Sequence, residues 1–392
     1  MMKKLAFLSV LVLSVMFVGA QNSKINSAIT YKKPEYNQLD KAKEAIDQAI
    51  VHEKTLNNPK AWKVRGEVYQ AIAQTQDEKF KALCTFPLDT ALASYKKAIE
   101  LDVKGTFKKD IDNHLKLLGI LLINKGIEYF NVENYAGALK SFESSLEIDA
   151  IADPGKVDSM IIFNAAIAAD KGKNYDKAVE YYQKTADLKY EGSRVYGFMA
   201  TVESERGDTV KYVEFLKAGI EAYPADNTAL MVTLINHYLN NDESEYALEY
   251  LTKAIEKDPA NHTFYFAQGA LYDKLKDFDN AKASYEKAIE VKADYADAYY
   301  NLGALYFNKG ADMLKEANNI PPKEQARYDA AIKEAFKELE KALPYLEKAH
   351  EYNPEEKSTV LTLKEIYFKL RNDNPDYMTK YNEYNEKAKA FE

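Results

Sequence analysis

The sequence predicts an all-α fold, in which helical hairpins stack side by side into a solenoid. One observation is that only 15 Gly and 11 Pro occur in 392 residues, so tight turns are few and long helices are favoured over a sheet. A second is that 46% of the residues are hydrophobic and 29% are charged, which suffices to bury a core and argues against disorder. The third is a pattern that recurs along the chain.

The recurring pattern has a period of 34 residues. Gly269 and Gly303 are separated by this distance, and so are Tyr265 and Tyr299. A period of this length that carries a Gly, aromatic residues and small Ala residues resembles the tetratricopeptide repeat (TPR) family. The resemblance implies that each unit is a pair of antiparallel helices, and that the array is a right-handed superhelix whose concave face consists mainly of first helices.

Seven such repeats are predicted between residues 59 and 355. The residues that match the family pattern are, in chain order, Trp62, Gly66, Tyr69, Ala91, Tyr95, Ala98, Gly126, Tyr129, Ala138, Phe142, Ala166, Ala178, Tyr182, Tyr196, Ala200, Leu216, Pro224, Met231, Tyr238, Ala247, Leu251, Ala254, Pro259, Tyr265, Gly269, Tyr272, Ala281, Tyr285, Ala288, Tyr299, Leu302, Gly303, Tyr306, Ala342, Leu346, Ala349 and Pro354. A small residue on the first helix allows the second helix to approach, and we expect the aromatic residues to fill the space between neighbouring units.

The flanking segments are predicted to cover the ends of the array, because the last apolar face of a repeat array needs a cap. Residues 35–56 are expected to form one amphipathic helix within an N-terminal segment, 21–58. Residues 357–391 are expected to form a helix pair within a C-terminal cap, 356–392.

Two insertions interrupt the period. The first adds 13 residues around the sequence QDEKFKALCTFP, and Pro87 is predicted to lie in the first turn of the helix that follows. The second adds 27 residues and predicts a projecting helical hairpin over 310–341. A helix from Lys323 to Glu351 would be roughly 44 Å long. This hairpin is a candidate contact for a partner or for a second copy of the chain, or it is a structural elaboration without a function.

The first twenty residues, MMKKLAFLSVLVLSVMFVGA, are typical of a signal peptide. Two lysines precede an apolar stretch, and Val18-Gly19-Ala20 offers small residues for cleavage before Gln21. A retained membrane anchor is the alternative, although the apolar stretch is short for a membrane span. Since no later segment is apolar enough to cross a membrane, we expect a soluble mature protein in a periplasm or outside the cell.

The sequence offers no pattern typical of a catalytic or cofactor site. The five histidines are far apart, and no phosphate-binding loop, dinucleotide fingerprint or nucleophile elbow is present. A formal net charge of −8 argues against a nucleic-acid binder. The one cysteine, Cys84, excludes an intramolecular disulfide. We therefore expect no enzyme activity, no cofactor and no metal.

The TPR resemblance implies that three positions on each first helix face the concave groove. In the first repeat these positions hold Lys63, Glu67 and Gln70. Where some TPR domains carry a Lys/Asn/Arg clamp for carboxylates, most slots here are apolar, so that activity is not carried over. Apolar residues form two candidate partner-binding patches: Ile123, Ile127, Phe130, Phe163 and Ile167 in one, and Val232, Phe266, Tyr300 and Phe307 in the other. The alternative is that neighbouring side chains cover them.

These features together favour an exported scaffold or assembly factor, which binds a peptide or helix of an envelope partner in its groove. A surface component that handles glycans and a self-assembling oligomer, joined through the 310–341 hairpin, are the alternatives. The sequence does not identify the partner, because repeat arrays share a fold and differ in what they bind.

Overall fold

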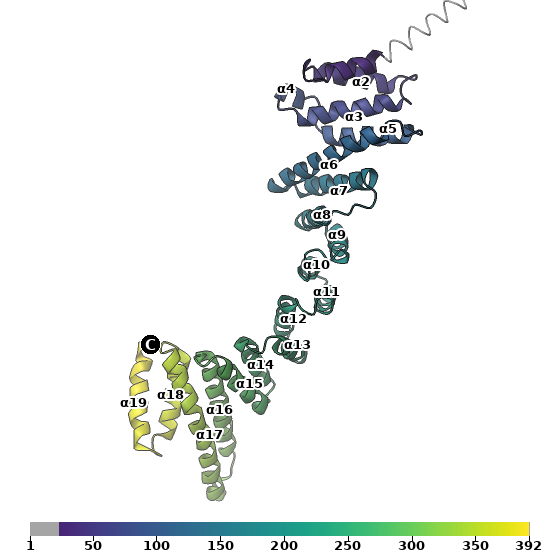
Figure 1. Ribbon diagram of the computed structural model, residues 1–392. Coiled ribbons are helices and arrows are strands. Elements are labelled where there is room, and N and C mark those ends of the chain that lie inside the picture. The colour runs from purple at the N-terminus through teal and green to yellow at the C-terminus, as the bar shows by residue number, and fades with distance from the viewer. Residues whose placement is uncertain (1–22, 392) are drawn as a thin grey trace, which may run out of the picture. The chain divides into compact units, whose positions relative to one another are not determined.

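The computed structural model describes residues 23–391, whose regular elements are all helices and which contain no strand (Figure 1). The predicted all-α array of TPR-like helical hairpins is confirmed for this part of the chain. The predicted signal peptide, residues 1–20, lies outside it. The chain divides into two compact units, Met1–Phe215 and Leu216–Glu392. Within the described residues no helix is both long and apolar enough to cross a membrane.

The first unit begins with a helix over residues 23–31. Its further helices are α2 (Leu39–Val51), α3 (Pro59–Gln74), α4 (Glu78–Lys81), α5 (Pro87–Leu101), α6 (Lys108–Asn131), α7 (Tyr135–Ala152), α8 (Ser159–Lys171), α9 (Tyr175–Asp187) and α10 (Arg194–Arg206). Antiparallel hairpins are formed by α3 with α5, by α6 with α7 and by α8 with α9.

The division between the units lies within α11 (Thr209–Ala222). The second unit then contains α12 (Thr228–Asn240), α13 (Ser244–Lys257), α14 (His262–Lys274), α15 (Phe278–Val291), α16 (Ala296–Ala317), η1 (Pro322–Glu324), α17 (Gln325–Tyr352), α18 (Lys357–Leu370), α19 (Pro375–Ala388) and η2 (Lys389–Phe391). Its hairpins pair each even-numbered helix from α12 to α18 with the helix that follows.

A short turn of one type closes several hairpins. One residue of this turn has a left-handed backbone conformation: φ is 60° at Glu133 after α6 and 62° at Lys276 after α14. The next residue then donates its N–H back to the helix, as Asn134 does to the Tyr129 carbonyl at 2.8 Å. This is the Schellman arrangement that satisfies the last carbonyls of a helix. The turn is short enough to place the second helix directly against the first.

Glycines on the first helices sit beneath large side chains of the second helices. A Cβ atom added to Gly66 would lie 2.5 Å from Tyr95, and one added to Gly269 would lie 2.7 Å from Tyr285. The Tyr95 ring also reaches the neighbouring unit, as expected, because it stacks on His114 of α6 at 5.8 Å between ring centroids. Each ring lies over the glycine of its own hairpin, because only a residue without a side chain leaves room for it.

The first insertion, between α3 and α5, contains the short helix α4 and places Pro87 at the first position of α5. The side chain of Phe80 from α4 is buried, at 2% exposed. The insertion is therefore not a free loop, since an apolar residue fixes it to the core.

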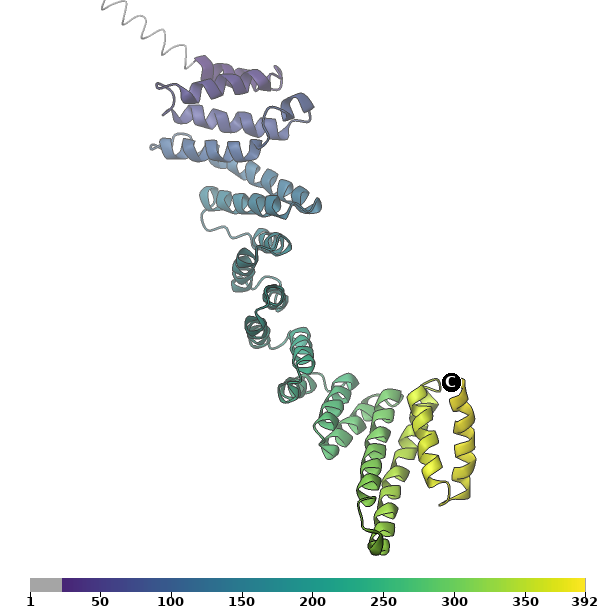
Figure 2. The same ribbon diagram turned by 180° about the vertical axis from the view of Figure 1, so that it is seen from behind.

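The second insertion forms the long hairpin of α16 and α17, with 22 and 28 residues. In both views it extends past the ends of α15 and α18 (Figures 1 and 2). The sequence period does not predict its second close contact, in which a Cβ added to Gly310 would lie 2.7 Å from Leu339. Packing of a glycine against a large residue thus continues into the projecting part.

The N-terminal segment differs from the expectation of one helix over 35–56. The structure has a helix over 23–31 and the separate helix α2, with Pro34 in the connection. Ile25 of the earlier helix is 2% exposed and Ala28 is fully buried. Both helices therefore contribute to the core of the first unit.

Candidate functional site

Five residues predicted to bind a partner lie on α6 and α8 of the first unit. Ile123, Phe130, Phe163 and Ile167 are half-buried and pack against one core cluster. Ile127 is exposed, at 45%. The structure therefore brings these residues to one apolar core, with their outer edges accessible to solvent.

Three further exposed apolar side chains of α6 and α8 were not predicted. Leu117 is 42% exposed, Ile120 is 56% exposed and Met160 is 52% exposed. We call these three residues, together with the five predicted ones, the α6–α8 patch. The family pattern assigns three groove positions to a first helix, whereas α6 has 24 residues. The apolar residues in KLLGILLINKGI, which recur at helical spacing, are the signal that could have identified the additional ones.

Phe163 shows why the predicted residues are only partly accessible. Its ring centroid lies 5.8 Å from that of Tyr190 and 5.9 Å from that of Phe198. These are ordinary distances for packed aromatic pairs. One face of Phe163 therefore stabilises the hairpin, and only the remainder is available to a partner.

The second predicted patch, in the second unit, is less accessible. Val232, Phe266, Tyr300 and Phe307 are all half-buried. The Phe266 ring packs between Tyr285, at 5.9 Å between centroids, and Tyr295, at 5.2 Å. These contacts favour internal packing as the main role of this patch.

The groove positions of the first hairpin are covered, contrary to the expectation from the repeat. Glu67 is 8% exposed and Gln70 is 3% exposed. Lys63 bonds to Glu67 at 2.6 Å and forms an ion pair with Asp110 of α6, whereas the Tyr95 hydroxyl donates to Gln70 Oε1 at 2.7 Å. The cover is the N-terminal half of α6, which is longer than the first helix of a regular repeat.

Charged groups form a cluster beneath this cover. Burial alone would raise the pKa of the Glu67 carboxyl, but Lys32 and Lys63 hold it below its ordinary value. Burial lowers the pKa of His114, although its Nε2 lies 3.6 Å from Glu67 Oε1. The cluster therefore favours a charged Glu67 and a neutral His114.

The same cluster contains the one combination of possible metal ligands found among the described residues. Ligand atoms of Glu67, Asp110 and His114 lie within 4.8 Å of one another. The ammonium groups of Lys63 and Lys32 already bond to these carboxylates. A cation would have to displace them, so the geometry favours an internal ion-pair network over a metal site.

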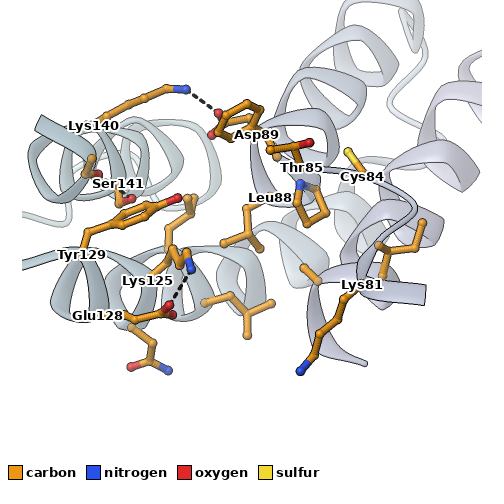
Figure 3. A pocket seen from close by; sticks show the side chains of 18 of the residues that line it. Lys81, Cys84, Thr85, Leu88, Asp89, Lys125, Glu128, Tyr129, Lys140 and Ser141 are labelled. Carbon is orange, nitrogen blue, oxygen red and sulfur yellow. Dashed lines mark hydrogen bonds and ion pairs between the residues drawn. The ribbon is translucent and has the colours of Figure 1, made fainter. Parts of the chain in front are cut away.

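A pocket of about 570 Å³ lies between the first insertion and the α6–α7 hairpin (Figure 3). Its apolar lining includes Ile72, Leu88, Leu121 and Leu122. The pocket is large enough for an apolar side chain of a partner. It exists because residues of the first insertion form one wall, so the repeat pattern alone does not predict it.

The rim of the pocket is charged, but its charges pair with one another. Lys140 forms an ion pair with Asp89, and Lys125 bonds to Glu128 at 2.7 Å (Figure 3). Cys84 lies in the wall, where its Sγ is 3.9 Å from Thr90 Oγ1. A third lysine of the lining, Lys81, pairs with Glu78 outside the pocket at 2.8 Å, so each of these charges already has a partner in the chain.

The long α16–α17 hairpin presents a charged surface. Among the described residues 310–341, none of the large apolar side chains is exposed. Lys309 and Lys341 both lie against Glu338, at 3.4 and 2.7 Å. This part of the hairpin therefore lacks the apolar patch that a stable protein contact usually needs.

Stacked hairpins with glycine under a large residue and apolar first-helix faces define a helical-repeat protein. The comparison with known families makes the class specific. A tetratricopeptide repeat model matches residues 232–290, and a TPR repeat model matches residues 271–310. The chain therefore contains TPR repeats over residues 232–310, which lie in its second unit.

Curated relatives are similar over part of their length. The chain is 25% identical over 251 residues to anaphase-promoting complex subunit 3 of Schizosaccharomyces pombe, over 62% of this chain and 36% of that protein. It is 22% identical to the BBSome complex member BBS4 of Bos taurus, over 65% of this chain and 49% of that protein. It is 32% identical to stress-induced-phosphoprotein 1 of Caenorhabditis elegans, over 36% of this chain and 45% of that protein. The chain thus spans between about a third and a half of these relatives.

Solved structures with similar hairpins include two from bacteria. A TPR repeats protein from Bacteroides fragilis is 22% identical, covers 63% of this chain and 97% of its own, and has a TM-score of 0.34. The C-terminal part of a TPR repeat-containing protein from Cytophaga hutchinsonii is 16% identical, covers 68% of this chain and 94% of its own, and has a TM-score of 0.44.

Proposed function

We propose that this TPR protein is an exported scaffold, which binds a segment of another envelope protein on the α6–α8 patch. TPR proteins bind other proteins, and the curated relatives named as complex subunits are in keeping with such a role. The observation that carries the proposal is the exposure of Ile120, Ile127 and Met160, at 56%, 45% and 52%, on the first helices of two neighbouring hairpins. An apolar strip of this kind suits an extended peptide or an amphipathic helix.

The binding proposal is tested by crosslinking in cells. A photoreactive residue at Met160 is expected to capture one specific partner, which mass spectrometry identifies. Ile120→Asp combined with Ile127→Asp should lose that partner, and both side chains are exposed. A variant that combines Ile127→Asp with Phe163→Asp should lose it too, but it is less suitable because Phe163 also packs in the core.

The matched control is Val51→Asp with Val103→Asp. These two valines are 75% and 93% exposed and lie off the patch. They introduce the same two charges at apolar surface positions. If the patch variant folds and captures the same partner as the control, the α6–α8 patch is not the binding site.

Export is the second part of the proposal, and it is supported by the basic and apolar pattern of residues 1–20. We expect cell fractionation to place the protein outside the cytoplasm. N-terminal sequencing of the purified protein should begin at Gln21. A cytoplasmic protein that retains Met1 or Met2 would contradict this part of the proposal and leave the binding surface unaffected.

A further inference from the structure

One face of α6 is open to solvent from residue 113 to the end of the helix. It carries eight residues, and every one of them is exposed. We call this set the α6 ridge; in chain order it consists of Asn113, Lys116, Leu117, Ile120, Asn124, Ile127, Glu128 and Asn131. Residues at these spacings share one side of a helix. The ridge therefore combines an apolar centre with polar ends on a single accessible surface.

The order of residues along the ridge is nearly symmetric about residue 122. Asn113 and Asn131 are equally distant from this point, and so are Leu117 and Ile127. Lys116 has Glu128 as its counterpart. If the ridge pairs antiparallel with an identical ridge, like meets like at the outer amide and apolar positions, and opposite charges meet at the charged ones. At the centre Ile120 meets Asn124.

We propose that the α6 ridge pairs antiparallel with the α6 ridge of a second copy of this chain, around a two-fold axis at the level of residue 122. Such an isologous contact places each ridge residue against its symmetry counterpart. The proposal goes beyond the proposed function. It shares Leu117, Ile120 and Ile127 with the α6–α8 patch, so self-pairing and the binding of a partner compete for these side chains.

Charge complementarity favours a second copy of this chain as the partner of the α6 ridge. Lys116 has no ion-pair partner among the described residues, and Glu128 pairs only with Lys125 of its own helix, at 2.7 Å. In the dimer each Lys116 faces a Glu128 of the other copy. Both ends of the contact gain one ion pair, which is a complementarity that an unrelated partner would have to match independently.

The size of the contact indicates a weak dimer. A helix of 24 residues is roughly 36 Å long. One pair of such helices buries less than a standard interface of about 1,600 Å². Ile120 and Asn124 lie nearest the axis and face one another, and a polar amide opposite an apolar side chain costs affinity. We therefore expect a reversible dimer that exchanges with the monomer.

Sedimentation velocity on the purified chain, from about 1 to 100 µM, tests the proposal. The wild type is expected to shift from monomer to dimer over this range. Lys116→Glu and Glu128→Lys should each weaken the dimer by about tenfold or more, because each places like charges opposite one another twice. The combined variant should recover the wild-type affinity, and Asn124→Leu should tighten the dimer by about tenfold.

Lys104→Glu is the matched control, because it makes the same charge change at an exposed position off the ridge. A wild type that stays monomeric at the highest concentration overturns the proposal. A dimer that neither reversal weakens, or that the combined variant does not restore, overturns it as well. The proposed function would survive each of these results, since its own test is the loss of a crosslinked partner.

Discussion

Two glycines of the same helix, Gly119 and Gly126 of α6, should respond in opposite ways to a single methyl group. Both are buried within α6. A Cβ added at Gly126 would lie 2.6 Å from Phe142 Cε1 and 2.9 Å from Cδ1. A Cβ added at Gly119 would meet Ile148 Cγ2 at 3.5 Å and Ser145 Oγ at 3.6 Å, which are ordinary contacts.

The expected difference in stability between Gly119→Ala and Gly126→Ala follows from two opposing effects. Replacing Gly by Ala within a helix stabilises the folded state by about 0.5–1 kcal/mol. At Gly119 this gain stands alone. At Gly126 overpacking adds a cost of about 1–3 kcal/mol, because the buried Phe142 ring, which is only 2% exposed, would have to shift. Gly119→Ala should therefore be more stable than Gly126→Ala by about 2 kcal/mol.

Thermal unfolding followed by far-UV circular dichroism measures the difference. At about 2–4 °C per kcal/mol, we expect the two melting temperatures to differ by about 4–8 °C. Because repeat arrays do not always unfold in one step, amide hydrogen exchange in α6 and α7 provides the local measurement. Gly126→Ala with Phe142→Leu should recover part of the loss. If Gly126→Ala alone proves as stable as Gly119→Ala, close glycine packing does not determine the hairpin geometry.

Three other substitutions test other parts of the structure. Pro344 lies exposed inside α17, so Pro344→Ala should stabilise the second unit by about 2 kcal/mol in urea unfolding, since it restores a helical hydrogen bond; no gain would mean that another contact already compensates for the missing hydrogen bond. Glu67→Gln removes the carboxylate beneath Lys32 and Lys63 and should cost about 2–3 kcal/mol, whereas Glu100→Gln at an exposed pair should change stability by less than about 0.5 kcal/mol. Burial lowers the pKa of His114, so the unfolded chain takes up the proton first; the stability that neutral His114 contributes is present above pH ~6.5 and is lost as the pH falls through the folded-state pKa. The stability of His114→Asn should therefore depend less on pH between about pH 7 and 5 than that of the wild type, and equal slopes would show that His114 does not titrate with folding.

The sequence by itself determined the helical class and the hairpin repeat, because these depend on local spacing. The 34-residue period identifies Gly66, Gly126 and Gly269 as positions of close helix approach, and Pro87 predicts the start of α5. Such features need only a helix and its neighbour in the chain. The predicted groove residues of α6 and α8 likewise follow from their register in the repeat.

Only the tertiary structure decided which groove positions remain accessible. Glu67 and Gln70 occupy the same register as exposed residues elsewhere, yet the long α6 covers them. Phe266 is shielded by Tyr295, a residue of the next connection. Conversely, Leu117 and Ile120 are exposed because α6 continues past the regular length of a first helix. Burial depends on what a neighbouring segment places over a side chain, and a repeat pattern does not contain the lengths and contacts of the segments that depart from it.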